Sequence, residues 1–182
     1  EGVCPRLYIG NRNVQWDYAD TSELQSMDFN DHERSKFGLS AGDILVCEGG
    51  EVGRTCLWHG EVEDCYYQKA VHRLRSPHQE YAPGLFPRFM RWAARVGLLS
   101  DFTSQTSIAH LTQEKLSAVP IAVPSLPEQT RMRDVLDGID DSLKDLVGAL
   151  AKLTSLKAAL MQDLLTGRVR VTALLSDSEV MG

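Results

Sequence analysis

One stretch near the end of the chain, from Leu126 to Leu165, restricts the fold most strongly. Its apolar residues recur at alternating steps of four and three residues, which is the a/d pattern of a coiled coil. The apolar positions of this seam are Met132, Leu136, Ile139, Leu143, Leu146, Leu150 and Leu153. The pattern predicts one long helix whose narrow seam packs against a second helix.

The predicted helix has recognisable ends. Ser125 stands three residues before Glu128, the spacing of a capping box, and Pro127 lies in the first turn, where its missing N–H costs little. Gly167 marks the end of the helix. After Leu153 the apolar series slips by one residue, which indicates a local change of register.

The length of this helix indicates whether it can pack within its own domain. From 128 to 165 it would run about 57 Å, at a rise of about 1.5 Å per residue. The preceding part of the chain would form a globule roughly 36 Å across. We therefore expect the helix to project beyond the domain and to need a partner, because the chain has no second heptad stretch. The alternative is a shorter helix that folds back on the globule.

Composition and charge leave several classes of protein open. A chain of 182 residues suits one compact domain followed by the long helix. The net charge of −6 does not suggest nucleic-acid binding, but it does not exclude it, because binding depends on where the charges lie. No apolar run reaches membrane-spanning length and no signal peptide is recognisable, so a cytoplasmic location is expected. Because the chain begins with Glu1 and not Met, we expect a fragment or a processed product.

The cysteines show no metal-binding pattern. Cys4, Cys47, Cys56 and Cys65 contain no CxxC pair and have no histidines at zinc spacing. Reduced thiols are therefore predicted, and disulfides are the alternative.

The residues before the long helix predict a compact, mixed, β-rich domain, so the fold class is α+β with one long projecting coiled-coil-type helix. Residues 48–54 are glycine-rich but lack the Lys-Ser/Thr of a P-loop, and we interpret them as a tight turn between strands. The other expected elements are strands at 6–9, 44–47 and 55–58, a polar loop with a little helix at 17–34, a helix at 81–96, a short capped turn at 112–116 and a sheet-edge segment at 119–124.

The most basic stretch runs from 66 to 75. As one strand it would place Lys69, Arg73 and Arg75 on the same face. Such a face would suit nucleic-acid phosphates, and a solvated strand face is the alternative interpretation.

No catalytic constellation is present. The sequence has no G-x-S-x-G elbow, no H-E-x-x-H pair and no methyltransferase cofactor motif, so we predict no catalytic residue, metal or cofactor. Asp43, Glu48 and Glu51 are the one set of carboxylates that would allow a metal-dependent enzyme. Carboxylates beside a glycine-rich turn are common, however, so this is the third choice.

Two stretches carry a specific resemblance. Residues 116–129, LSAVPIAVPSLPEQ, and 153–171, LTSLKAALMQDLLTGRVRV, closely resemble the specificity (S) subunit of type I restriction-modification systems. The stretches 7–16, 42–45, 49–54 and 106–111 fit the same family. Val119-Pro120 departs from the Ile-Pro that the family pattern has at this place.

The resemblance implies a non-catalytic protein that recognises double-stranded DNA. An S subunit carries two target recognition domains, each followed by a long helix, and the two helices pack antiparallel. Modification subunits, which hold S-adenosylmethionine, flank it, and restriction subunits join for cleavage. This chain has one such domain and one helix, so we expect a homodimer, which would read a palindromic split site, or the other half of a longer S subunit.

The resemblance also suggests boundaries and contacts. We expect a recognition domain at 1–124, the long helix at 125–168 and a tail at 169–182. The residues that we expect to contact DNA are Asn11, Arg12, Asn13, Arg54, Gln68, Lys69, Arg73, Gln105, Thr106 and Ser107. The alternative function is a coiled-coil scaffold whose globular head binds protein. A cationic concave face on the globular head would favour DNA binding over this scaffold function.

Overall fold

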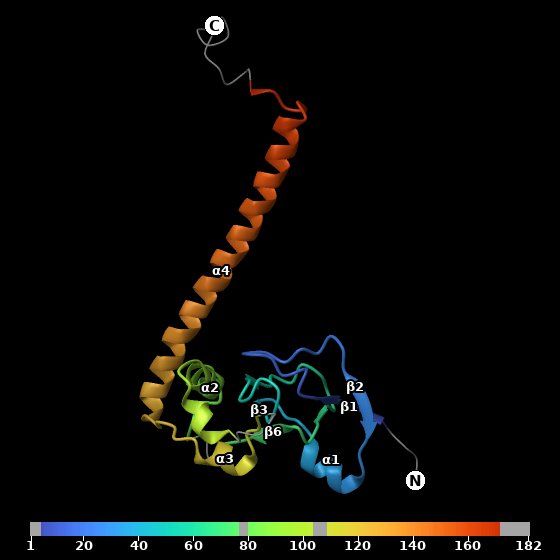
Figure 1. The fold of residues 1–182 in the computed structure, drawn as a ribbon, viewed down its shortest axis with the longest axis vertical. Coiled ribbons are helices and arrows are strands. Elements are labelled where there is room, and N and C mark those ends of the chain that lie inside the picture. Colours follow the sequence, from blue (N-terminus) through green and yellow to red (C-terminus); the bar gives the residue numbers. More distant parts are fainter. Residues whose placement is uncertain (1–4, 77–79, 104–108, 172–182) are drawn as a thin grey trace, which may run out of the picture. The chain divides into compact units, whose positions relative to one another are not determined.

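The computed structural model describes residues 5–76, 80–103 and 109–171 (Figure 1). Contacts within the chain divide it into two compact units, Glu1–Arg133 and Asp134–Gly182. The first unit contains all of the strands and the first two turns of the long helix, and the rest of that helix belongs to the second unit.

The first unit contains two three-stranded sheets. In one, the central strand β1 (Pro5–Ile9) pairs antiparallel with β2 (Gln25–Asp28) and parallel with β5 (Tyr66–Tyr67). In the other, β3 (Ile44–Cys47) is central and its neighbours, both antiparallel, are β4 (Thr55–Leu57) and β6 (Val71–Leu74).

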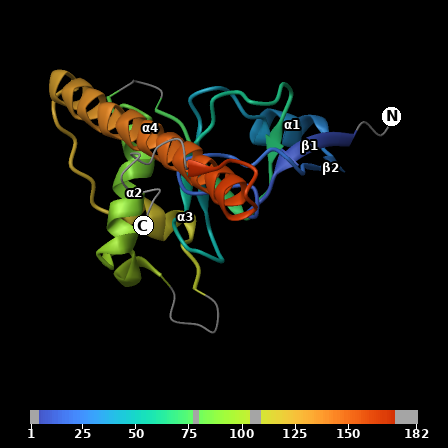
Figure 2. The same cartoon turned by 90° about the horizontal axis from the view of Figure 1, so that it is seen from above.

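Two helices of this unit, α1 and α3, begin at side-chain caps. Asn30 and Glu33 form a capping box at the start of α1 (Asp31–Phe37), and the Thr112 hydroxyl accepts a bond from the Lys115 N–H at the start of α3 (Gln113–Ala118). The remaining helices of the chain are α2 (Leu85–Arg95), the 3₁₀ helix η1 (Leu98–Phe102) and α4 (Leu126–Leu165). In the two views, β1, β2 and α1 lie at one end of the unit, and α2 and α3 lie at the other (Figures 1 and 2).

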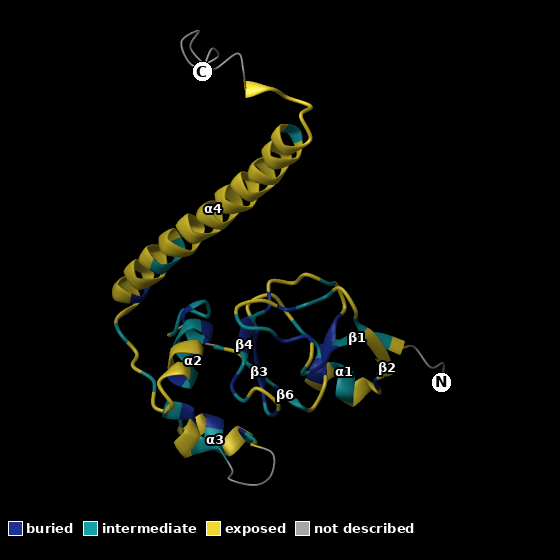
Figure 3. Cartoon of the chain, turned by 45° about the horizontal axis from the view of Figure 1, so that its top comes forward, coloured by how far each residue is buried: buried dark blue, intermediate teal, exposed yellow. Residues whose placement is uncertain are grey.

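Strand β3 explains how one short apolar run supports two cores. Successive side chains of a strand point to opposite faces. Leu45 and Cys47 join the cluster around Trp58 and the first sheet, whereas Ile44 and Val46 join the cluster around α2 and α3. All four residues of β3 are buried, which is why the strand is a continuous apolar run (Figure 3).

The described cysteines Cys47, Cys56 and Cys65 are free and buried, as predicted, and Cys4 lies outside the described residues. Burial raises the pKa of Cys56 from 9.0 to about 12 and that of Cys65 to about 11. Both thiols therefore hold their protons in the folded state at a pH where the unfolded chain has lost them.

This difference predicts a loss of stability at alkaline pH. The contribution of each thiol is fully present below pH 9 and disappears as the pH rises towards the raised values of about 11 and 12. We expect the free energy of unfolding, measured by urea titration, to fall from pH 9 upwards, and to fall less steeply in Cys56→Ala. Equal slopes for the two proteins would contradict this assignment.

Two expectations about strands are wrong. The stretch 66–75 is not one strand, because the chain turns at 68–70, where the Val71 N–H donates to the Gln68 carbonyl. β5 and β6 therefore belong to different sheets, so the predicted face with three cations does not form; Arg75 pairs with the buried Asp43 instead. Residues 119–124 precede α4 without joining either sheet.

The helix predicted near the end of the chain is confirmed. The Glu128 carboxylate accepts bonds from the Ser125 hydroxyl, at 2.7 Å, and from the Ser125 N–H, at 3.0 Å, and these bonds lower the pKa of Glu128. At the other end, Gly167 adopts a left-handed φ of +73°, which favours glycine after a helix.

Gln129 fixes the first turns of α4 within the first unit. Its side chain is 1% exposed, accepts a bond from the Ala82 N–H and donates to the carbonyls of Glu80 and Pro124. The amide thereby satisfies three backbone groups that come from two separate segments.

We expect Gln129→Ala to lower the free energy of unfolding by about 2–4 kcal/mol, because it removes three hydrogen bonds that the buried side chain makes with part-buried backbone groups. Chemical denaturation measures this loss. The matched control is Thr130→Ala, whose exposed hydroxyl bonds only to the Leu126 carbonyl and should cost about 0.5 kcal/mol or less. A loss for Gln129→Ala no larger than that of the control would contradict the anchoring role.

Candidate nucleic-acid interface

A groove of about 550 Å³ opens on the first unit. α1, the β5–β6 segment, Phe86 of α2, α3 and the segment after α3 all contribute to it. Its lining residues are Lys36, Phe37, Tyr67, Lys69, Val71, His72, Arg73, Leu74, Phe86, Gln113, Leu116, Ser117, Val119 and Ile121. No carboxylate is among these lining residues, although the chain as a whole is acidic. We call this feature the cationic groove.

Three cations give the groove its charge. Lys69 is exposed, and within the described residues no hydrogen bond or ion pair holds its ammonium group. Lys36 lies over the Phe37 ring at 5.3 Å, a contact that leaves its charge uncompensated. Arg73 donates to the Gly38 carbonyl and lies over the Tyr67 ring at 5.4 Å.

Hydrogen-bonding groups complete the groove. His72 Nε2 lies 2.7 Å from the Leu111 carbonyl, which can only accept, so this nitrogen carries a proton. Burial raises the pKa of Tyr67, so its phenol stays protonated and can donate. The groove thus combines fixed positive charge with hydrogen-bonding groups, as nucleic-acid interfaces do.

Asn11 and Arg54, predicted from separate stretches, lie together away from the groove lining. Arg54 donates to the Asn11 backbone carbonyl at 2.7 Å, and the Asn11 amide donates to the Gly49 carbonyl at 3.0 Å. Glu51 lies 3.5 Å from the Arg54 guanidinium. These contacts join the loop after β1 to the glycine-rich turn, and both residues serve that junction.

The neighbouring pair Arg12 and Asn13 separates into one exposed and one buried residue. Arg12 is exposed and donates to the Glu23 carbonyl. Asn13 is 5% exposed, and its amide bonds to backbone groups of Gly10, Asp20 and Glu23. The Asn13 side chain holds the loop together in this structure, and a DNA contact by Asn13 stays a prediction.

The remaining predicted contacts fall in three places. Lys69 and Arg73 line the groove. Gln68 is exposed in the β5–β6 turn, with its backbone N–H donating to the Ile9 carbonyl. Gln105, Thr106 and Ser107 lie outside the described residues.

Sequence reasoning missed Lys36, Gln113 and Ser117 of the groove lining. Gln113 lies in the predicted capped turn at 112–116, and Ser117 follows it directly. Their spacing of four residues was the available signal, because such residues share one face if the turn continues as a helix. Nothing in the sequence around Lys36 connects it with a site 33 residues further along the chain.

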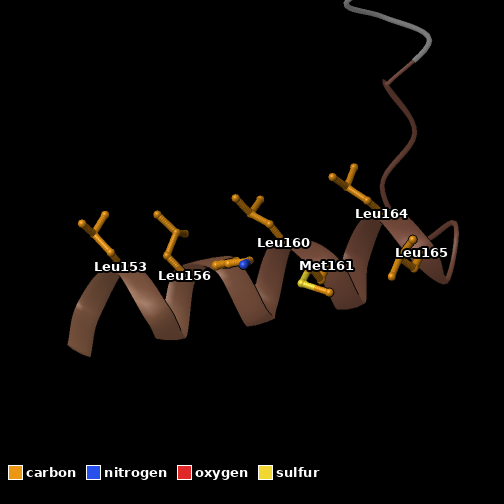
Figure 4. Close-up of a pocket in the computed structure, with 7 residues that line it drawn as sticks. Leu153, Leu156, Leu160, Met161, Leu164 and Leu165 are labelled. Atoms are coloured by element: carbon orange, nitrogen blue, oxygen red, sulfur yellow. The ribbon is translucent and has the colours of Figure 1, made fainter. Parts of the chain in front are cut away.

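The seam of α4 is exposed within this chain. Met132, Ile139, Leu143, Leu146, Leu150 and Leu153 keep 46–66% of their surface accessible, and Leu136 is half-buried. Beyond the register slip the apolar face continues, and its residues line a shallow groove of about 480 Å³. In Figure 4, Leu153, Leu156, Leu160 and Leu164 form a row on one side of the helix, and Met161 and Leu165 lie beside it.

Other kinds of site find no support in the part of the chain that the structure covers. Among those residues no three His, Cys, Asp or Glu side chains gather into a metal-binding group. Asp43, the carboxylate singled out for a metal, is 1% exposed and pairs with Arg75. Within the described residues, no helix combines the length and the apolarity that crossing a membrane requires.

An α+β domain followed by a helix with an exposed apolar seam defines a class of two-part protein: a globular head and a long helix. Comparison with known families is consistent with that class. Residues 17–153 match the family described as "Type I restriction modification DNA specificity domain". The match covers more than half of the chain, and the chain therefore belongs to this family.

Solved structures share the fold. One match is a chain from a study of complex assembly and conformational transition of the type I R-M system, with a TM-score of 0.65 and 12% identity over 93% of this chain. Another is the HsdS subunit from Thermoanaerobacter tengcongensis, with a TM-score of 0.61 and 15% identity over 88% of this chain. The matches cover 44% and 42% of those chains, so this chain spans less than half the length of either.

Proposed function

We propose that this chain is the DNA-recognition part of a type I specificity subunit and binds duplex DNA through the cationic groove. The observation that carries the proposal is the composition of the groove: Lys36, Lys69 and Arg73 line it, and no carboxylate does. Phosphate contacts from such cations supply most of the affinity of a DNA-binding protein. Membership of the family supports the same conclusion.

The competing function is a scaffold whose head binds protein. The overall acidity of the chain favours it. The concave surface that would discriminate between the two functions is cationic, however, which favours DNA. The exposed seam of α4 fits either function, because both need a partner helix.

The roles that we propose for the parts of the chain follow the family pattern. Residues 1–124 recognise DNA, 125–168 form the spacer and assembly helix, and 169–182 are a tail. Modification and restriction subunits supply the chemistry, so this chain has a non-catalytic role. A complex of this kind acts on cellular DNA and is expected in the cytoplasm.

The helix partner is a second copy of this chain or the other half of a longer subunit. The charges of α4 and the residues after it support antiparallel pairing of two copies. The first part of α4 carries more carboxylates (Glu128, Asp134, Asp137, Asp140, Asp141 and Asp145) than cations (Arg131, Arg133 and Lys144). The later part, taken on to Arg170, carries more cations (Lys152, Lys157, Arg168 and Arg170) than carboxylates (Asp163). An antiparallel pair places these opposite charges near one another, whereas a parallel pair places like charges together.

A salt series tests the proposed DNA binding. Fluorescence anisotropy with a labelled random-sequence duplex should give an affinity that falls steeply as salt rises. We expect a slope of log K against log salt of about −3, since each neutralised phosphate contributes about −0.9 and the groove offers three cations. Absence of binding by the folded chain at low salt would contradict the proposal and favour the scaffold function.

A further inference from the structure

The cationic groove contains two chemically different sets of side chains. Lys36 and Lys69 come from α1 and the β5–β6 turn and carry charge. Gln113 and Ser117 come from α3 and are neutral. A lysine ammonium is a point charge that suits a phosphate and carries no information about the base beside it. An amide, in contrast, presents a donor and an acceptor together.

Gln113 has its full hydrogen-bonding capacity available. The residue is exposed, and within the described part of the chain its side-chain amide bonds to no other group. A glutamine amide matches the N6 donor and N7 acceptor of adenine with two simultaneous bonds in the major groove.

Ser117 lies one turn further along the same helix. Its hydroxyl donates to the Gln113 backbone carbonyl at 2.8 Å, so the oxygen lone pairs remain for a donor in the groove. Ser117 and Gln113 therefore offer a base edge one acceptor and one donor–acceptor pair from adjacent positions on a helix face.

The helix α3, which carries these side chains, is itself anchored in the domain. The Thr112 hydroxyl caps the helix, and the Leu116 side chain is buried in the cluster that also contains Leu111 and Met90. A residue that reads a base must be positioned before DNA arrives, because a loose side chain loses discrimination.

Charge also distinguishes the surface of α3 from the part of the groove that Lys36 and Lys69 line. Glu114 is exposed and, with Thr112, Gln113 and Ser117, lines the adjoining surface of α3. A carboxylate at this place repels phosphates, so the DNA backbone is expected to follow the lysines and to leave the base edges facing α3.

We propose that α3 is the base-reading element of the cationic groove and that Gln113 recognises an adenine in one half of the target. The inference rests on the proposed DNA-binding function and adds to it the residue that determines specificity. Lys36 and Lys69 then serve as sequence-independent phosphate contacts.

The test is a selection from a random duplex pool, followed by sequencing, with the full chain together with a modification subunit. The unmodified protein should enrich an adenine at one position of its half-site. Gln113→Ala should lose that preference by about 5- to 150-fold relative to the competing bases while the slope of affinity against salt stays the same. Gln113→Glu, which can only accept, should shift the preference towards cytosine, whose N4 group donates.

Lys69→Ala is the contrasting variant. It should weaken binding to all sequences and lower the salt slope by about one, with the base preferences unchanged. Selection of the same motif by Gln113→Ala and the unmodified protein, with DNA binding intact, would overturn the assignment to Gln113 but leave the proposed function standing. Failure of the unmodified protein to enrich any DNA would overturn both.

Discussion

Leu143→Asp combined with Leu150→Asp should convert the homodimer proposed for this chain into a monomer. The two side chains are 54% and 65% exposed within the chain and occupy the same position in successive heptads of the α4 seam. Two carboxylates at these positions would be buried without partners in a helix pair, which costs far more than the lost apolar contact. Light scattering after gel filtration measures the mass directly.

A matched control separates the seam from the helix itself. Lys144→Asp with Ala151→Asp introduces the same residues at the same spacing, one position further along and outside the seam. This variant should keep the oligomeric mass of the unmodified protein. An unchanged mass for the Leu143 and Leu150 variant would mean that the seam makes no contact between copies.

The second large effect concerns the cationic groove. Lys36→Glu with Lys69→Glu should lower the affinity for every duplex on the order of 100-fold and reduce the salt slope by about two, because two phosphate contacts become repulsive. Anisotropy titrations at several salt concentrations measure both quantities. The loss should be the same for all sequences, since lysines contact phosphates and not base edges.

Charge reversal elsewhere on the first unit provides the control. Arg95 is exposed on α2 and does not line the cationic groove, so Arg95→Glu should leave affinity and salt slope nearly unchanged. Equal losses for Arg95→Glu and the groove variant would indicate a general effect of net charge and would remove the groove from the interface.

The elements that were predictable from sequence carry local signals. The run Ile44–Cys47 before a glycine-rich turn predicted β3, and Thr112 predicted the start of α3. The heptad series together with Ser125, Glu128 and Gly167 predicted α4. In each case the cause lies within a few residues, either as a cap, as a turn that favours a left-handed glycine, or as helical periodicity.

The break between β5 and β6 was not predictable in this way. Alternation of side chains over 66–75 is the same whether the chain continues straight or turns at 68–70. The outcome depends on pairing of Tyr66–Tyr67 with β1 and of Val71–Leu74 with β3, which are distant in sequence. The strand β2 was missed for the same reason, since its four exposed residues form a strand only beside β1.

In the candidate site, too, some residues were predictable from the sequence and others were not. Lys69 and Arg73 stood out because they belong to the most basic stretch of the sequence. Lys36 and Gln113 reach the same groove from α1 and α3, so only the tertiary structure reveals them. The burial of Asn13 was also invisible, because an asparagine that holds a loop and one that reads a base look alike in sequence.

We propose that this chain recognises a specific DNA sequence and forms one half of a specificity subunit that binds a split DNA target. The most direct measurement is selection from a random duplex pool by the chain bound to a modification subunit, followed by sequencing. We expect enrichment of a split motif with a fixed gap, palindromic if two copies of this chain pair through α4. No enriched motif from a folded protein in an assembled complex would contradict it.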